Sequence, residues 1–185
     1  MTRTFRASII AAAIVISGAS LAQAKTSNPM VGGAAMYPTK NIVENAVNSK
    51  DHTTLVAAVK AAGLVETLSG PGPFTVFAPT NAAFAKLPAG TVETLVKPEN
   101  KGTLTTILTY HVVPGRITAA NIAASAKAHH GVASYTTVQG GTLTFKKGMK
   151  GWTITDAKGN TGKITIANVM QSNGVIHVID TVMMP

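Results

Sequence analysis

Without cysteine, a zinc or copper site in this sequence would depend mainly on histidine or methionine. His129 and His130 are adjacent, and adjacent residues do not converge on one ion as an i, i+4 pair on a helix does. Copper sites built from methionine need clustered, exposed thioethers, whereas Met170, Met183 and Met184 lie beside apolar stretches that predict core strands. We therefore expect no metal site and interpret these methionines as core-filling residues.

The sequence offers no convincing set of catalytic residues either. Acid–base catalysis needs two titratable groups held close together with different pKa values. Acids are few and widely spread, and on a strand His177 and Asp180 point to opposite faces because they are three residues apart. The sequence also has no thiol, no Gly-x-Ser-x-Gly turn and no glycine loop of the kind that holds phosphates. We expect a protein that is not an enzyme and needs no cofactor, with His177 as a core residue.

A polar pair inside an apolar segment is the remaining candidate for binding. Tyr110 and His111 stand where a helical pattern passes directly into a strand pattern. In one interpretation both rings face the core and their polar atoms are satisfied internally. In the other, the segment forms a contact patch for a partner. The bulky aliphatic residues around the pair are Ile107, Leu108, Val112 and Val113.

The first 24 residues have the order of a secretory signal peptide. Arg3 and Arg6 precede an apolar run over residues 9–16, and Ala22-Gln23-Ala24 supplies the small residues of a cleavage site. The apolar run is shorter than the roughly 20 residues that span a bilayer, and the small-residue site argues against an uncleaved anchor. We expect cleavage after Ala24 and an exported product located in a periplasm, outside the cell or at the cell surface.

The expected mature product is basic and has the size of one domain, with 161 residues. Without cysteine, its stability must come from a hydrophobic core. The formal charge of +9 falls to +7 when Arg3 and Arg6 leave with the signal. Such a domain is attracted to acidic polymers. Export argues against nucleic acid as a partner, so we expect a protein or an acidic polysaccharide of a cell surface or matrix.

Periodicity separates a spacer from a domain and indicates helices in the first half of that domain. Residues 25–38 mix Gly, Pro and small residues without periodicity and predict a flexible spacer, followed by a single domain over residues 39–185. Gly63 predicts the end of a helix. Apolar residues recur at helical spacing over residues 41–47, 55–62, 92–96 and 104–108.

The second half changes to the alternation of strands. Apolar and polar residues alternate over residues 142–146, 152–155 and 163–166, which predicts a meander of three or four strands with one face on the core. Phe74–Ala78 and Val175–Ile179 are almost continuously apolar and predict strands covered on both faces in the middle of the fold. Helices followed by strands predict an α+β domain.

Three segments of the sequence can be compared with the signatures of known families, beyond their secondary-structure pattern. They run from Thr75 to Phe84, from Ile107 to Gly115 and from Asn173 to Pro185. The first predicts a buried strand that ends at a proline, followed by a helix capped by Thr80. In this order and at this spacing the three segments resemble the N-terminal signature, the Tyr-His segment and the C-terminal signature of the fasciclin domain family. The resemblance covers about residues 39–185.

The resemblance implies a single fasciclin-like domain, with a helical layer packed on a small, twisted, mainly antiparallel sheet. It also implies adhesion, because fasciclin domains occur in matrix and cell-surface proteins. In animal members the Tyr-His segment is linked to integrin binding, which implies Tyr110, His111 and their aliphatic neighbours as contact residues. This sequence departs from the family at Asn81, often an acid, and at Met183 and Met184, usually leucines.

The function expected from these observations is that of an exported adhesion or interaction module that binds protein or polymer. The alternative is a periplasmic binding module for a small or lipidic ligand, held in a cleft between helices and sheet. A deep apolar pocket with convergent polar groups would favour this alternative.

Overall fold

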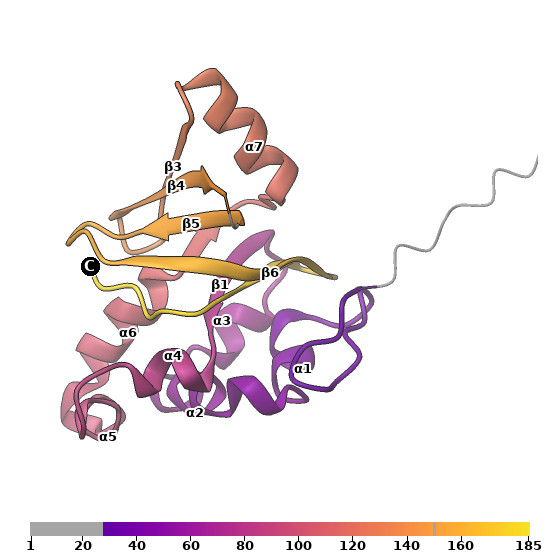
Figure 1. Cartoon of the computed structure of the whole chain (residues 1–185). Coiled ribbons are helices and arrows are strands. Elements are labelled where there is room, and N and C mark those ends of the chain that lie inside the picture. The colour runs from indigo at the N-terminus through magenta and orange to yellow at the C-terminus, as the bar shows by residue number, and fades with distance from the viewer. Residues whose placement is uncertain (1–27, 150) are drawn as a thin grey trace, which may run out of the picture.

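A computed structural model describes residues 28–149 and 151–185. The expected signal peptide and the first residues of the expected spacer lie outside these ranges. Helices α1–α6 lie together on one side of a seven-stranded sheet, and helix α7 lies at the opposite end of the molecule (Figure 1). This arrangement confirms the predicted α+β class.

Six short helices form between residues 41 and 110. The Asn41 and Glu44 side chains form a capping box that starts the first of them. Gly63 ends the second in the left-handed region at φ 73°, and the Thr80 hydroxyl accepts the Ala83 amide at the start of the fourth, both as predicted. The helices are α1 (Ile42–Ala46), α2 (Thr53–Ala62), α3 (Val65–Ser69), α4 (Asn81–Ala85), α5 (Thr91–Leu95) and α6 (Lys101–Tyr110), with 3-10 turns at Lys50–His52 and Pro98–Asn100.

The strands form one sheet in the order β2-β1-β7-β6-β5-β4-β3. Strands β3 to β7 are a continuous antiparallel meander, longer than the one predicted, whereas β1 pairs with β7 in parallel. The sheet is therefore mainly antiparallel. The strands are β1 (Phe74–Pro79), β2 (Val112–Pro114), β3 (Val132–Thr136), β4 (Thr142–Gly148), β5 (Gly151–Thr155), β6 (Thr161–Gln171) and β7 (Gly174–Ile179).

The central strands β1 and β7 separate two hydrophobic clusters. Val76 and Ile176 face the cluster beneath helices α1–α6. Phe77 and Ile179, on the opposite faces of the same strands, belong to a second cluster with Tyr110. Because side chains alternate along a strand, a strand covered on both faces must be apolar at nearly every position. This explains the two continuous apolar runs.

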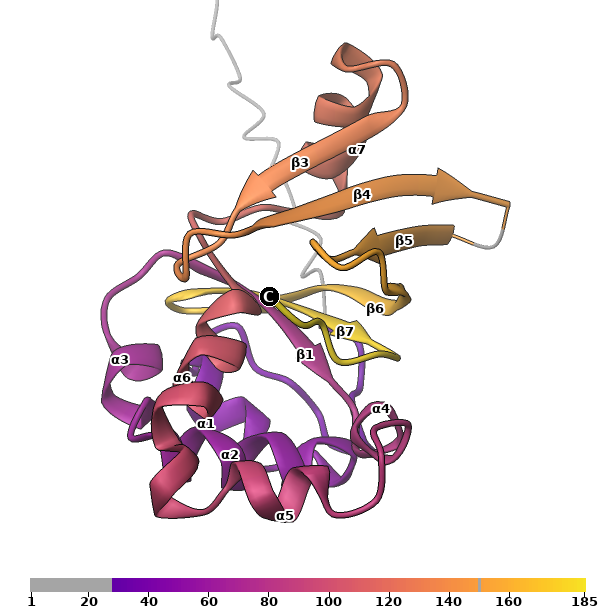
Figure 2. The ribbon, with the colours of Figure 1, turned by 90° about the vertical axis from the view of Figure 1, so that its left-hand side faces the viewer.

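Helix α7 (Ala119–Ala128) was not predicted from the sequence. Its residues are mostly alanine, and only Ile122 and Ala126 are buried, so the apolar periodicity is weak. The local start signal was present, since Thr118 and Asn121 form a reciprocal capping box. The helix covers β3 and β4 at the end of the molecule that is remote from α1–α6 (Figure 2).

Residues 28–38, called here the N-terminal arm, differ from the expected flexible spacer. Val31 and Met36 are buried with 4 and 5% of their surface exposed, and both belong to the cluster beneath the helices. The Asn28 side chain accepts the Met170 amide and donates to the Met170 carbonyl, as a neighbouring strand would. Two buried apolar side chains and these two hydrogen bonds between the Asn28 side chain and the Met170 backbone hold the arm against the domain.

Candidate functional site

The Tyr-His segment lies inside the domain. Tyr110 is fully buried and His111 is 2% exposed. A side chain so enclosed cannot touch a partner while the domain keeps this fold. The structure therefore describes the first of the two interpretations, with both rings in the core. The exposed fractions of the aliphatic neighbours are 6% for Ile107, 5% for Leu108, 6% for Val112 and 2% for Val113.

The Tyr110 hydroxyl connects helix α6 with the far part of the sheet. It donates a hydrogen bond to the Thr142 carbonyl at 2.8 Å and accepts one from the Ala157 amide at 2.9 Å. Burial raises the pKa of Tyr110, an effect that the bond from Ala157 opposes and nearby Asp156 reinforces. Both polar functions of the phenol are thus used inside the protein.

His111 is held as a neutral ring by two backbone groups. Its Nδ1 donates to the Ile107 carbonyl at 2.8 Å, and its Nε2 accepts the Met183 amide at 2.9 Å. An amide can only donate and a carbonyl can only accept, so these partners determine the tautomer. Burial lowers the pKa of His111 to about 4, against smaller opposing effects of the Ile107 carbonyl and Asp156.

His177 is also a core residue. Its Nε2 donates to the Ile117 carbonyl at 2.8 Å, its ring stacks on Phe77 with centroids 5.5 Å apart, and burial lowers its pKa. Asp180 instead forms an ion pair with Lys86 at 3.7 Å. His177 and Asp180 therefore have different partners and do not form an acid–base pair.

The remaining metal candidates differ in their exposure to solvent. His129 and His130 are exposed after helix α7, and the His129 Nδ1 donates to the Ser125 carbonyl at 2.8 Å. Met183 is fully buried, whereas Met170 and Met184 are half-buried. Within residues 28–149 and 151–185, no three His, Asp or Glu side chains gather closely enough to hold a metal ion.

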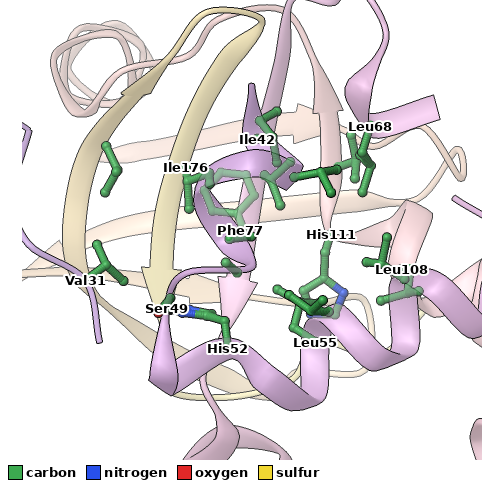
Figure 3. A pocket seen from close by; sticks show the side chains of 18 of the residues that line it. Val31, Ile42, Ser49, His52, Leu55, Leu68, Phe77, Leu108, His111 and Ile176 are labelled. Atoms are coloured by element: carbon green, nitrogen blue, oxygen red, sulfur yellow. Dashed lines mark hydrogen bonds between the residues drawn. The ribbon is translucent and has the colours of Figure 1, made fainter. Parts of the chain in front are cut away.

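An apolar cavity of about 50 Å³ lies between the helical layer and the sheet (Figure 3). Helices α1–α3 line one side of it and strands β1 and β7 the other, while Val31 and Met36 of the N-terminal arm close one end. Figure 3 shows His52 and Ser49 near Val31, with His111 farther along the cavity. His111 uses both ring nitrogens internally, and Lys60, which also lines the cavity, is exposed to solvent, so His52 is the buried titratable group that can offer a polar atom to this space.

His52 has one ring nitrogen without a partner. The residue is 3% exposed, and its Nδ1 lies 2.8 Å from the Ser49 hydroxyl, while Nε2 has no hydrogen bond. Burial lowers the pKa of His52, which the Ala78 backbone and Asp51 oppose less strongly. An unpaired buried polar atom costs about 1–3 kcal/mol. No sequence motif includes His52, and its burial beside the apolar helix α2 is a signal that only the structure supplies.

The charges of the chain divide between its two halves, a signal that was present in the sequence and was missed. Residues 39–99 carry five basic and five acidic residues, whereas residues 100–185 carry eight basic and two acidic ones, a net charge of +6. Strands β3–β5 and helix α7 form the end of the molecule remote from α1–α6 (Figures 1 and 2). Four exposed lysines are called here the basic lobe: Lys127 in α7, Lys146 and Lys147 in β4, and Lys158 in the turn that follows β5.

The two acids of the C-terminal half do not neutralise the basic lobe. Asp156 is 6% exposed, and its carboxylate accepts the backbone amides of Asn160 and Met184. Asp180 is paired with Lys86. Among the residues that the structure describes, no basic-lobe lysine lies within 4.0 Å of a carboxylate. The positive potential of this end is therefore directed to solvent.

The family model of the Fasciclin domain matches residues 50–185. The chain therefore belongs to the fasciclin domain family, as the three signature segments, the helical layer and the mixed sheet indicate. The relative "Protein sll1483" of Synechocystis sp. is 52% identical over 158 residues, which are 84% of this chain and 79% of the relative.

Two mycobacterial proteins are also similar along most of their length. Immunogenic protein MPB70 of Mycobacterium bovis is 35% identical over 184 residues, covering 95% of this chain and 85% of the relative. Cell surface glycolipoprotein MPB83 of the same species is 35% identical over 177 residues, covering 91% of this chain and 71% of the relative. The family resemblance thus extends to a protein named for its position at the cell surface.

A solved structure has the same fold. The FAS1 domain pair from the insect cell adhesion molecule fasciclin I matches with a TM-score of 0.69 and 16% sequence identity. The match covers 79% of this chain and 51% of that one, so this chain spans about half of the domain pair. In the part of the chain that the structure describes, no helix is both long enough and apolar enough to cross a bilayer.

Proposed function

We propose that this chain is an exported attachment module that binds protein or acidic polymer at a cell surface or matrix and catalyses no reaction. The proposal depends on one observation, the exposed basic lobe, whose four lysines have no carboxylate within 4.0 Å among the described residues. Such a surface attracts acidic partners over about one Debye length, roughly 8–10 Å at ordinary ionic strength. The surface and adhesion proteins among its relatives support this role.

The proposed contact surface is the basic lobe and not the Tyr-His segment. Tyr110 and His111 have no surface to offer a partner, but Tyr110 bonds to Thr142 at the start of β4 and to Ala157 beside Lys158. The Tyr-His segment therefore stabilises the backbone near the basic lobe through these two hydrogen bonds. Changes there would reduce attachment through loss of stability, together with a lowered melting temperature.

The experiment compares two variants of equal charge. One replaces the basic-lobe lysines, Lys127, Lys146, Lys147 and Lys158, by glutamine, and the other replaces Lys40, Lys50, Lys60 and Lys97 of the helical half. Retention of the purified protein on an immobilised acidic polysaccharide should fall about tenfold or more for the first variant and about twofold for the second, because attraction depends on local charge. Equal losses would mean that net charge acts without a defined surface.

A cellular test addresses attachment itself. Deletion of the gene should reduce attachment or aggregation of the producing cells, and the basic-lobe variant should fail to restore it, while the helical-half variant should restore it. Unchanged attachment after deletion, with purified protein retained by no cell or polymer, would contradict the proposed function.

The cavity supports a second candidate, a binding module for a small ligand. Its walls are mostly apolar, His52 Nε2 is a buried polar atom without a hydrogen bond among the described residues that line it, and the N-terminal arm closes one end. Ligand pockets usually measure about 300–1,000 Å³, so this cavity of about 50 Å³ must enlarge before it can hold an apolar body and orient one polar group. The fitting ligand class is a short aliphatic chain with a single hydroxyl or carboxyl group, admitted by movement of the arm.

This second candidate is tested with 1-hexanol and hexane as probes. In an NMR titration, we expect hexanol to shift the His52 ring resonances saturably. Hexane should give a weaker shift. Replacing Ala46 by Leu should abolish the response, because Ala46 lines the cavity and the larger side chain fills it. The exposed His129 should not respond. No saturable shift, or an equal shift at His129, would exclude a ligand site.

A further inference from the structure

The tip of the β4–β5 hairpin combines an apolar side chain with positive charge. Gly148 of β4 pairs with Gly151 of β5, and Met149 follows Gly148 at the tip. The Met149 side chain is fully exposed, at 105%, more than any other large apolar residue of the described chain. A single exposed apolar side chain is common on protein surfaces, so its significance depends on the side chains around it.

Positively charged and amphipathic side chains surround this tip. Lys146 and Lys147 are consecutive strand residues, so one projects from each face of the hairpin. Trp152, the single tryptophan of the chain, pairs directly with Lys147 and is half-buried. Tryptophan prefers the boundary between water and lipid, and lysine prefers the phosphate level of an anionic membrane.

We propose that the β4–β5 hairpin docks the domain on an anionic phospholipid bilayer, with Met149 inserted below the head groups and Lys146 and Lys147 at the phosphates. The proposal rests on the proposed attachment function and names its partner. An acidic polysaccharide would attract the lysines alone. A bilayer would attract the lysines with its phosphates and would also bury the exposed Met149 side chain among its acyl chains. This combination of charge and exposed apolar surface favours lipid over polysaccharide.

The test uses the mature protein and vesicles of phosphatidylglycerol and phosphatidylcholine, with phosphatidylcholine vesicles as the neutral comparison. The wild-type protein should sediment with the anionic vesicles only, and the binding should weaken as salt rises. The emission of Trp152 should shift to the blue on binding, because the indole lies next to the inserted tip. Since the chain has one tryptophan, this signal needs no label.

The variants separate insertion from charge. Met149→Ser should weaken binding to anionic vesicles about tenfold, and Lys147→Gln about fivefold. Val138→Ser, at a residue 50% exposed in the turn between β3 and β4, is the matched control and should change binding less than about twofold. Dextran sulfate serves as a lipid-free polyanion, and its affinity for Met149→Ser should equal that of the wild-type protein.

Each outcome bears on one proposal. Vesicle binding by Met149→Ser at wild-type strength, or no blue shift of Trp152, would overturn docking by the hairpin and leave attachment by charge intact. Equal loss of vesicle and dextran sulfate binding in Met149→Ser would assign the hairpin to a general polyanion surface and overturn the lipid proposal. Wild-type protein that binds neither probe would overturn the attachment function as well.

Discussion

The backbone amide of Met183 donates a hydrogen bond to Nε2 of His111 at 2.9 Å, across 72 positions of the chain. This bond joins the Tyr-His segment to the closing segment of the domain. Phe77, from the first signature segment, lies in the same hydrophobic cluster as Tyr110 and Ile179. The three segments that carry the family resemblance therefore form one core, and changes at this junction should affect stability.

Acid should destabilise the domain through His111. The unfolded ring has a pKa near 6.5 and the folded ring a pKa of about 4, so the unfolded state binds more protons below pH 6.5. The stabilisation is complete above pH 6.5 and is lost as pH falls toward 4, by up to about 3 kcal/mol. Urea unfolding between pH 7.5 and about 4 measures this slope.

Two substitutions assign the slope to His111. His111→Gln should lower stability at pH 7 but flatten the dependence on pH, because glutamine does not titrate. His129→Gln, at an exposed histidine, should leave both quantities unchanged. A full slope in His111→Gln would mean that His52 or His177, whose pKa values burial also lowers, carries the effect.

Tyr110→Phe should lower the free energy of unfolding by about 1–3 kcal/mol, because the Thr142 carbonyl and the Ala157 amide lose their partner. Thermal unfolding measured by circular dichroism tests this effect. Tyr37→Phe is the matched control, since Tyr37 is 51% exposed. If both variants unfold at the wild-type temperature, the phenol does not connect α6 with the sheet in solution.

Met36→Ala should cost about 2–5 kcal/mol, the usual range for removing a buried methionine side chain. The expectation follows from packing of the N-terminal arm on the core. Met30→Ala, in the same arm but 63% exposed, should change stability by less than about 0.5 kcal/mol. Chemical denaturation of both variants is the measurement, and indistinguishable midpoints would show that the arm is a free spacer after all.

Gly174→Ala should destabilise the domain by about 3 kcal/mol, because the new Cβ would collide with the Phe74 carbonyl where β7 begins its parallel pairing with β1. Gly102→Ala offers the opposite case. No atom lies near that Cβ position in α6, so the helix should gain up to about 1 kcal/mol from alanine. Differential scanning calorimetry should show melting temperatures that move in opposite directions, and a fall in both would contradict the packing at Gly174.

Local signals in the sequence predicted much of the fold. The apolar runs of β1 and β7, the alternation of β4 to β6, the Thr80 cap and the Gly63 stop each depend on residues within a few positions, so no tertiary information was needed. Helix α7 and strand β3 escaped prediction because small or half-exposed residues leave little periodicity. The N-terminal arm also gave no local sign of packing, since Val31 and Met36 meet distant residues.

The sequence by itself determined the composition, the positive charge, the absence of cysteine and the three segments of one family. Only the tertiary structure decided that Tyr110 and His111 are enclosed, that His52 faces an apolar cavity and that four lysines share one exposed end of the molecule. The physical reason is the distance along the chain over which each kind of interaction acts. Periodicity depends on neighbours along the chain, whereas burial and hydrogen bonding depend on partners such as Thr142 and Met183, which lie 32 and 72 positions away.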